Sequence, residues 1–268
     1  MISQQNMKRF PCAFVLLAAL LGSATYAMDI IAHRGASHAA PENTLAAFQL
    51  AWKEGADGIE GDFYLTKDRR IVCIHDKQTK RLAGKDLDVT QATLAELQAL
   101  DVGVWKDPRF AGERIPTLEQ VLATVPEGKR IFIEIKDSER IVAHLQQVLE
   151  DAPVKSEQIT IIAFSIDVIR MCKAHLPEIK ASWLVSKKDL DRDTLSGIVQ
   201  TAKGFDFKAI GLQSGAHIDE ALVKVLHAAG LELHTWTGNS GEDARRYHAL
   251  GLKSVTTDKP GYIRTELK

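Results

Sequence analysis

Runs of apolar, mostly β-branched residues alternate along this chain with segments in which apolar residues recur every three or four positions. Eight runs are strand-like: residues 29–33, 58–65, 130–135, 159–164, 181–185, 209–213, 231–236 and 254–257. The segments with helical spacing are 44–52, 93–100, 118–122, 140–149, 168–172, 190–199, 218–226 and 242–250. Since short apolar runs are typical of buried strands and the longer period is typical of amphipathic helices, the pattern predicts an α/β protein.

Eight strands that alternate with helices predict a (β/α)8 TIM barrel, formed by residues 28–268 as a single domain. The alternative is a doubly wound open sheet, which usually has fewer strands and a glycine-rich first turn. The chain contains no G-x-G-x-x-G motif. We therefore expect the closed barrel.

The alternation is interrupted once, between residues 77 and 116. About forty residues lie between the strand-like segment 71–75 and the next barrel helix, whereas most connections have about four to six. We therefore predict a small insertion after the second strand, over the mouth of the barrel. It could cover bound substrate or simply pack at the rim, and we favour the role at the substrate.

The N-terminal residues have the pattern of a secretory signal peptide. Lys8 and Arg9 precede an apolar segment at 14–21, and the small-residue pattern of Thr25-Tyr26-Ala27 follows it. The apolar segment is too short to span a bilayer, so a signal peptide of residues 1–27 is favoured over a retained anchor or a buried helix. We expect export, to the periplasm or as a secreted protein, and no stable membrane span.

Composition places the chain among ordinary soluble globular proteins, with 45% hydrophobic and 26% charged residues and a net charge of −1. No basic patch with interleaved aromatic residues is present, which argues against a nucleic-acid binder. Cys12 would leave with the signal peptide, and we expect Cys73 and Cys172 to be buried core residues, although a disulfide between them stays open. Oligomeric state cannot be predicted from this sequence.

Ionisable residues stand in or directly after several of the predicted strands: His33, Glu60, Asp62, His75 and Glu134. The active sites of such barrels form at the C-terminal ends of the strands, so these side chains should meet. Three carboxylates at one place repel each other unless a cation lies between them. Oxygen ligands suit Mg²⁺ or Ca²⁺, and two histidines suit acid–base catalysis near neutral pH. The set predicts metal-assisted cleavage of an anionic substrate.

Seven short segments, in this order and spacing, resemble the signature blocks of the glycerophosphodiester phosphodiesterases. They are 33–36 (HRGA), 41–44 (PENT), 60–62 (EGD), 66–68 (TKD), 74–76 (IHD), 134–136 (EIK) and 234–239 (HTWTGN). The resemblance extends from residue 29 to Asp258-Lys259-Pro260. It implies a (β/α)8 barrel with a small insertion after the second strand. The implied activity is hydrolysis of a small-molecule glycerophosphodiester to glycerol 3-phosphate and an alcohol.

The resemblance also assigns roles to single positions. Glu60, Asp62 and Glu134 match the ligands of a divalent metal, magnesium or calcium, and His33 and His75 match the acid–base pair. Arg34 and Lys136 match positions near the phosphate, and Trp236 matches an aromatic residue near the substrate. The family has a glutamate at Glu42, which could assist the site or belong only to a helix start.

Two glycines depart from the family pattern. Gly61 stands between the two acids, and Gly238 stands within the tryptophan block. We expect Gly61 to point away from the lumen and to have little effect. Gly238 lies near the mouth, where it could change the shape of the alcohol pocket, and the alcohol itself is not specified by the sequence.

Two other functions stay open. A phospholipase-like diesterase of the sphingomyelinase D type would act on lipid and would need an exposed apolar rim, for which Trp105 and Phe110 in the insertion are the candidates. A non-catalytic glycerophosphodiester-binding protein is the second alternative. It is disfavoured because every expected catalytic position is filled.

Overall fold

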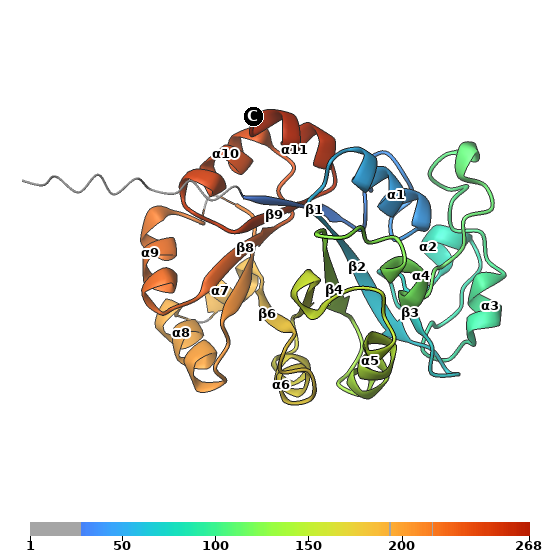
Figure 1. Cartoon of the computed structure of the whole chain (residues 1–268), viewed down its shortest axis with the longest axis horizontal. Coiled ribbons are helices and arrows are strands. Elements are labelled where there is room, and N and C mark those ends of the chain that lie inside the picture. Colours follow the sequence, from blue (N-terminus) through green and yellow to red (C-terminus); the bar gives the residue numbers. More distant parts are fainter. Residues whose placement is uncertain (1–27, 193, 216) are drawn as a thin grey trace, which may run out of the picture.

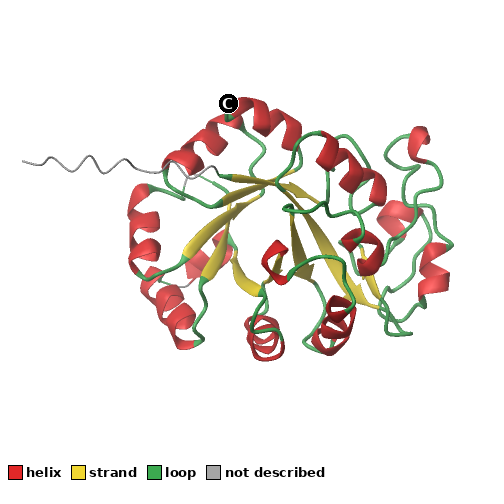
Figure 2. Cartoon of the chain, in the orientation of Figure 1, coloured by secondary structure: helices red, strands yellow, loops and turns green. Residues whose placement is uncertain are grey.

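The computed structural model describes residues 28–192, 194–215 and 217–268, so the predicted signal peptide lies outside the described residues. Eight parallel strands stand at the centre, with helices around them (Figure 2). They are β1 (Asp29–His33), β2 (Gly58–Leu65), β4 (Arg130–Ile135), β5 (Ile159–Ala163), β6 (Lys180–Val185), β7 (Ala209–Gln213), β8 (Glu232–Trp236) and β9 (Ser254–Thr257). Because β1 pairs with both β9 and β2, the sheet closes, and the predicted TIM barrel is confirmed.

The outer helices are α1 (Leu45–Lys53), α4 (Leu118–Leu122), α5 (Ile141–Glu150), α6 (Ile166–His175), α8 (Leu195–Gly204), α9 (Glu220–Ala228), α10 (Gly241–Ala249) and α11 (Pro260–Glu266). The prediction of one helix over 190–199 is wrong. The chain forms α7 (Lys187–Arg192) and then α8, because the Thr194 side chain accepts a hydrogen bond from the Gly197 backbone N–H and starts a new helix. Helix α11, which the pattern did not predict, begins at a proline and buries Ile263.

Side chains alternate between the lumen and the helix layer along each barrel strand. Ile31, Phe132, Ile162 and Leu184 form an apolar cluster, with Trp236 packed against it. At the N-terminal end of β8, Glu232 pairs with Lys180, and His234 is buried against Glu232 and Ser254. With its base and middle filled in this way, the barrel leaves its C-terminal end as the place for polar functional groups.

Between β2 and α4, the chain leaves the barrel. Strand β3 (Ile71–Cys73) pairs antiparallel with the far end of β2, and then come α2 (Lys80–Ala83), α3 (Leu94–Gln98) and the short 3-10 helix η1 (Pro108–Phe110). Figure 1 shows α2 and α3 beside α1 and α4. This segment packs a small core of its own, made of Tyr64, Val72, Ile74, Leu82, Val89, Ala92, Leu97, Val102 and Ile115.

Cys73 and Cys172 are free and buried, so the expectation of two core cysteines is confirmed and no disulfide joins them. Among the described residues, no helix is both long enough and apolar enough to cross a membrane.

Candidate active site

Three acids converge at the C-terminal end of the barrel. Glu60 and Asp62 are two residues apart on β2 and point to the same side, and Asp62 lies opposite Glu134 in the register of β2 with β4. One carboxylate oxygen from each acid lies within 4.8 Å of the others. The residues are 1%, 1% and 8% exposed, respectively, so water does little to screen their charges.

Polar neighbours hold each acid in place. The Asn43 amide donates a hydrogen bond of 2.8 Å to Asp62 Oδ2, and the Arg34 guanidinium lies 3.2 Å from the same oxygen. The backbone N–H of Arg34 donates to Glu60 Oε2 at 2.9 Å. Nζ of Lys136 lies 2.9 Å from Glu134 Oε1. The cluster is therefore a preorganised arrangement rather than a loose group of surface acids.

Positive charge from the protein does not neutralise the cluster completely. Burial raises the pKa of Glu60 to about 8, and the negative charge of Asp62 adds to the increase. Burial also raises the pKa of Glu134. Burial alone would raise the pKa of Asp62 too, but Arg34 and Lys136 outweigh it and lower that pKa.

An oxygen of the acid cluster has no hydrogen-bond partner among the described residues. Glu60 Oε1 is buried and has no hydrogen-bond partner within the part of the chain that the structure describes. A buried carboxylate oxygen without a partner is costly unless a cation binds it. Three such oxygen donors fit a hard divalent ion such as Mg²⁺ or Ca²⁺.

His33 ends β1 at the same mouth, and its Nδ1 lies 2.6 Å from Asp258 Oδ1. Asp258 also accepts hydrogen bonds from Ser37 at 3.0 Å and from Asn239 at 2.6 Å. Burial alone would lower the pKa of His33, but the hydrogen bond to Asp258 and the charge of Glu60 outweigh it and raise that pKa. The position of His33 is thus fixed through a residue that lies after the last strand.

His75 follows β3 and faces the mouth from the side of the insertion. Its Nδ1 lies 2.8 Å from Asp76 Oδ1. Burial lowers the pKa of His75, and the positive charges of Arg34 and Lys136 lower it further against the charge of Asp62. The two histidines therefore differ in proton affinity, as the two members of an acid–base pair do.

The loop after β1 brings Arg34 against the acids. Arg34 has a φ of 55° and Gly35 a φ of 80°, a left-handed turn. A Cβ on Gly35 would lie 2.6 Å from the Ala47 backbone, so only glycine fits there. The turn lets Arg34 bind Glu60 through its backbone and Asp62 and Glu42 through its guanidinium. Glu42, whose role the sequence left open, thus contacts the site.

Trp236 ends β8 at the same end of the barrel. Its indole N–H donates to the Gly211 carbonyl at 3.1 Å, which fixes the ring. The ring of Phe164 meets it edge to face, with 5.3 Å between the centroids, and Phe164 is 42% exposed. The two rings form an aromatic wall at the C-terminal end of the barrel.

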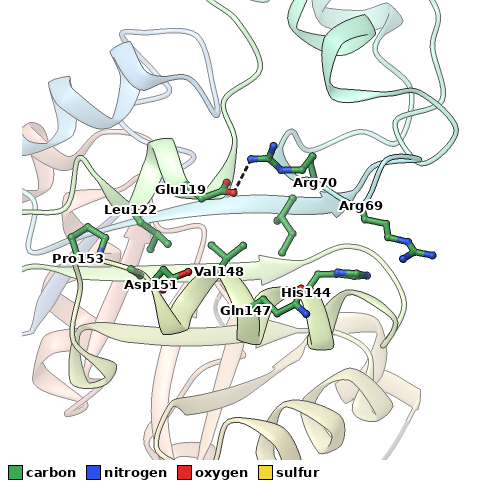
Figure 3. A pocket seen from close by; sticks show the side chains of 11 residues that line it. Arg69, Arg70, Glu119, Leu122, His144, Gln147, Val148, Asp151 and Pro153 are labelled. Carbon is green, nitrogen blue, oxygen red and sulfur yellow. Dashed lines mark hydrogen bonds and ion pairs between the residues drawn. The ribbon is translucent and has the colours of Figure 1, made fainter.

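Cavities mark which surfaces a ligand could reach. One of about 620 Å³ lies beside His75 and Lys136 and is lined further by Tyr64, Asp76, Lys77, Gln78, Lys80 and Arg81. A smaller one of about 350 Å³ lies outside the barrel along α4 and α5, where Arg70 pairs with Glu119 (Figure 3). None of the predicted site residues lines this second cavity.

The two glycines that depart from the family pattern both face the packing layer. A Cβ on Gly61 would meet Cys73, Phe63 and Phe48, on the side away from the lumen, as we expected. A Cβ on Gly238 would lie 2.6 Å from Val255 Cγ2. The expectation that Gly238 shapes the alcohol pocket is therefore wrong, because this position is filled by the neighbouring strand.

Comparison with known proteins assigns the family. A sequence profile of the glycerophosphoryl diester phosphodiesterase family matches residues 33–262. The chain belongs to this family. A glycerophosphodiester phosphodiesterase of Caldanaerobacter subterraneus is 33% identical over 86% of this chain and 94% of its own. The YhdW protein of Bacillus subtilis is 35% identical over 88% of this chain and 96% of its own.

Solved structures agree with this assignment. A phosphodiesterase of Oleispira antarctica, in complex with the product sn-glycerol-3-phosphate, has a TM-score of 0.80 and 28% identity, and the match covers 89% of this chain and 96% of that one. A glycerophosphodiester phosphodiesterase of Thermotoga maritima has a TM-score of 0.75 and 26% identity, over 89% and 98%. The chain is accordingly a phosphoric diester hydrolase of the glycerophosphodiester phosphodiesterase family.

Each predicted site residue of this family member lies at or near the mouth of the barrel. Sequence reasoning gave no role to several residues that hold the site: Asn43, Asp76, Arg81, Phe164 and Asp258. The sequence held a signal for three of them, because Asn43 and Asp76 stand inside the quoted family blocks and Asp258 stands where the resemblance ends. Arg81 and Phe164 lay in segments with no such signal.

Proposed function

We propose that this chain hydrolyses glycerophosphodiesters to glycerol 3-phosphate and an alcohol, with a divalent cation held by Glu60, Asp62 and Glu134. The observation that carries the proposal is the buried triad of acids, in which one oxygen of Glu60 has no partner and burial raises the pKa of Glu60 and of Glu134. When bound, Mg²⁺ or Ca²⁺ would offset the negative charge that grows on the phosphate oxygens. The product complex of the Oleispira relative supports glycerol 3-phosphate as the product.

The chain's own residues supply orientation and proton transfer. Arg34 and Lys136 already lie beside the acids, where they would bind the nonbridging phosphate oxygens. Trp236 would pack against the carbon skeleton of the substrate. His33 and His75 each bind an aspartate through Nδ1, which leaves Nε2 to exchange a proton with the substrate.

The glycerol 2-hydroxyl is the nucleophile in this proposal, because it is held beside the phosphate by its own chain. Its oxygen forms a bond to phosphorus and gives its proton to one histidine. The bond from phosphorus to the alcohol oxygen breaks, and the other histidine protonates that oxygen. Water then opens the cyclic phosphate to glycerol 3-phosphate, and the two histidines return to their starting states.

A lipid substrate is the less favoured alternative. It needs an apolar rim, and in the insertion only Val104 and Trp105 are large exposed apolar residues among those the structure describes. Phe110, which the sequence put forward for that rim, is half-buried. A binding protein without activity is disfavoured by the oriented histidines, since binding alone does not need them.

We also propose that residues 1–27 are a signal peptide and that the enzyme works after export, in the periplasm or outside the cell. The support is the charge and hydropathy pattern of these residues.

The deciding experiment is incubation of purified protein with glycerophosphocholine, followed by analysis of the phosphate esters, with His33→Ala and His75→Ala as variants. The expected products are glycerol 3-phosphate and choline, and each variant should lose about 10²- to 10⁴-fold in kcat. Wild-type protein that binds the diester without cleaving it would contradict the proposal.

A further inference from the structure

Arg81 lies in the insertion, outside the barrel, yet its guanidinium reaches the barrel mouth. Its Nη1 and Nη2 donate to the two carboxylate oxygens of Glu42 at 3.0 and 2.8 Å. Its Nε donates to Oδ2 of Asp76. A planar guanidinium can bind two carboxylates in this way in a single fixed orientation. Next to it on α2, Leu82 is 4% exposed and belongs to the insertion's own core, which anchors the helix.

Each of the two carboxylates leads to a residue of the proposed site. Asp76 uses its other oxygen to bind Nδ1 of His75. Glu42 binds Nη1 of Arg34 at 3.0 Å. A continuous series of contacts therefore runs from His75 through Asp76, Arg81 and Glu42 to Arg34.

The exposure of Arg81 argues that its ion pairs do not serve mainly to stabilise the fold. Its side chain is 44% exposed, and ion pairs that exposed contribute little to folding. Asp76 is 33% exposed, so without Arg81 its carboxylate could turn toward water and release His75. Glu42 would keep Arg34 but lose the contact that fixes its own orientation. Loss of Arg81 would therefore change the orientation of His75 and Glu42, and catalysis is sensitive to the orientation of such groups.

We propose that Arg81 is a positioning residue that sets the orientation of His75 and Arg34 through Asp76 and Glu42. The insertion thereby completes the phosphate site of the barrel through these two carboxylates. This inference rests on the proposed function, since it assigns His75 and Arg34 to the reaction.

The first test compares Arg81→Met and Arg81→Lys with Arg70→Met. Arg70 is a matched control, because it is 47% exposed and pairs with Glu119 at 2.9 Å, away from the mouth (Figure 3). Arg81→Met should lower kcat/KM for glycerophosphocholine by about 10- to 100-fold, the usual effect of removing an orienting neighbour. Arg81→Lys should recover only part of the lost kcat/KM, because an ammonium group cannot bind two carboxylates with the planar geometry of a guanidinium. Arg70→Met should stay within about twofold.

The second test asks whether Arg81 acts through the two carboxylates. In an Asp76→Asn, Glu42→Gln background, the guanidinium has no charged partner left to orient. Adding Arg81→Met there should change kcat/KM by less than about twofold. If the effects of Arg81→Met were the same in both backgrounds, the contacts would not be the route and the proposal would be overturned.

The third test measures the binding of glycerol 3-phosphate, which does not depend on turnover. Titration calorimetry with glycerol 3-phosphate should give a Kd for Arg81→Met that is about 3- to 10-fold weaker than that of the wild type, because Arg34 is less well held. Equal Kd and equal kcat/KM for Arg81→Met and wild type would overturn the proposal. A wild-type protein that bound the product but cleaved no diester would instead contradict the proposed function, and the Kd values would still decide the role of Arg81.

Discussion

Replacing Asp258 by asparagine should disable His33 without unfolding the barrel. Oδ1 of Asp258 accepts from His33 and Ser37, and Oδ2 accepts from Asn239. Asn239 cannot turn its amide to help, because its own oxygen already accepts from Thr257 and from the Asp258 backbone. An asparagine at 258 would therefore direct its NH₂ group either at the NH₂ group of Asn239, which is also a donor, or at Nδ1 of His33.

The magnitude follows from these contacts. A hydrogen bond to a charged group is worth about 1.5–3 kcal/mol. If the variant loses only the orientation of His33, kcat should fall by about 10- to 150-fold, since each 1.36 kcal/mol is tenfold in rate. If the NH₂ group faces Nδ1, the imidazole must carry its proton on Nε2, and the loss should approach about 10⁴-fold.

The assay is steady-state hydrolysis of glycerophosphocholine across pH, with thermal unfolding of each variant. Because Asp258 raises the pKa of His33, its removal should move the His33 limb of the pH profile to lower pH. Asp167→Asn is the control, since it changes an exposed pair with Arg170. If Asp258→Asn kept wild-type kcat while His33→Ala was inactive, the pair would have no role in catalysis and this reasoning would be refuted.

Three further outcomes are expected. N-terminal sequencing of protein from the cell envelope should begin at or within a few residues of Met28, and intact Met1 on a cytoplasmic protein would exclude the signal peptide. A diester whose glycerol lacks the 2-hydroxyl should bind but turn over far more slowly than glycerophosphocholine, and equal rates would make water the nucleophile. Phe164→Ala should raise KM more than it lowers kcat, because Phe164 supports Trp236 and meets no group that transfers a proton. An unchanged KM would mean that Phe164 and Trp236 do not form part of the substrate site.

The fold could be predicted closely because its strands are buried on both faces. Strands β1, β2, β4, β7 and β9 begin and end at the residues that the apolar runs gave. The helices were harder, since a single capping side chain at Thr194 divides one apolar pattern into two helices. A pattern that averages over several turns cannot register one hydrogen bond.

The proposed ligands and histidines could be predicted because each stands at or near a strand end. The contacts through which other residues orient them could not be predicted. Asp258 is 225 residues from His33 along the chain, and Arg81 is 39 residues from Glu42. Contacts of this kind depend on how the barrel closes and how the insertion packs. Spacing in the sequence carries no information about them.

The central claim is that Glu60, Asp62 and Glu134 hold a divalent cation that hydrolysis requires. The most direct measurement is turnover of glycerophosphocholine before chelation, after chelation, and after Mg²⁺ or Ca²⁺ is added back, in the wild type and in Asp62→Ala. The wild type should lose activity with chelator and regain it with metal. Asp62→Ala should stay inactive when metal is added back, and a cooperative thermal transition should show that it still folds, although the contacts of Asn43 and Arg34 with Asp62 are lost. Full turnover in excess chelator would contradict the claim.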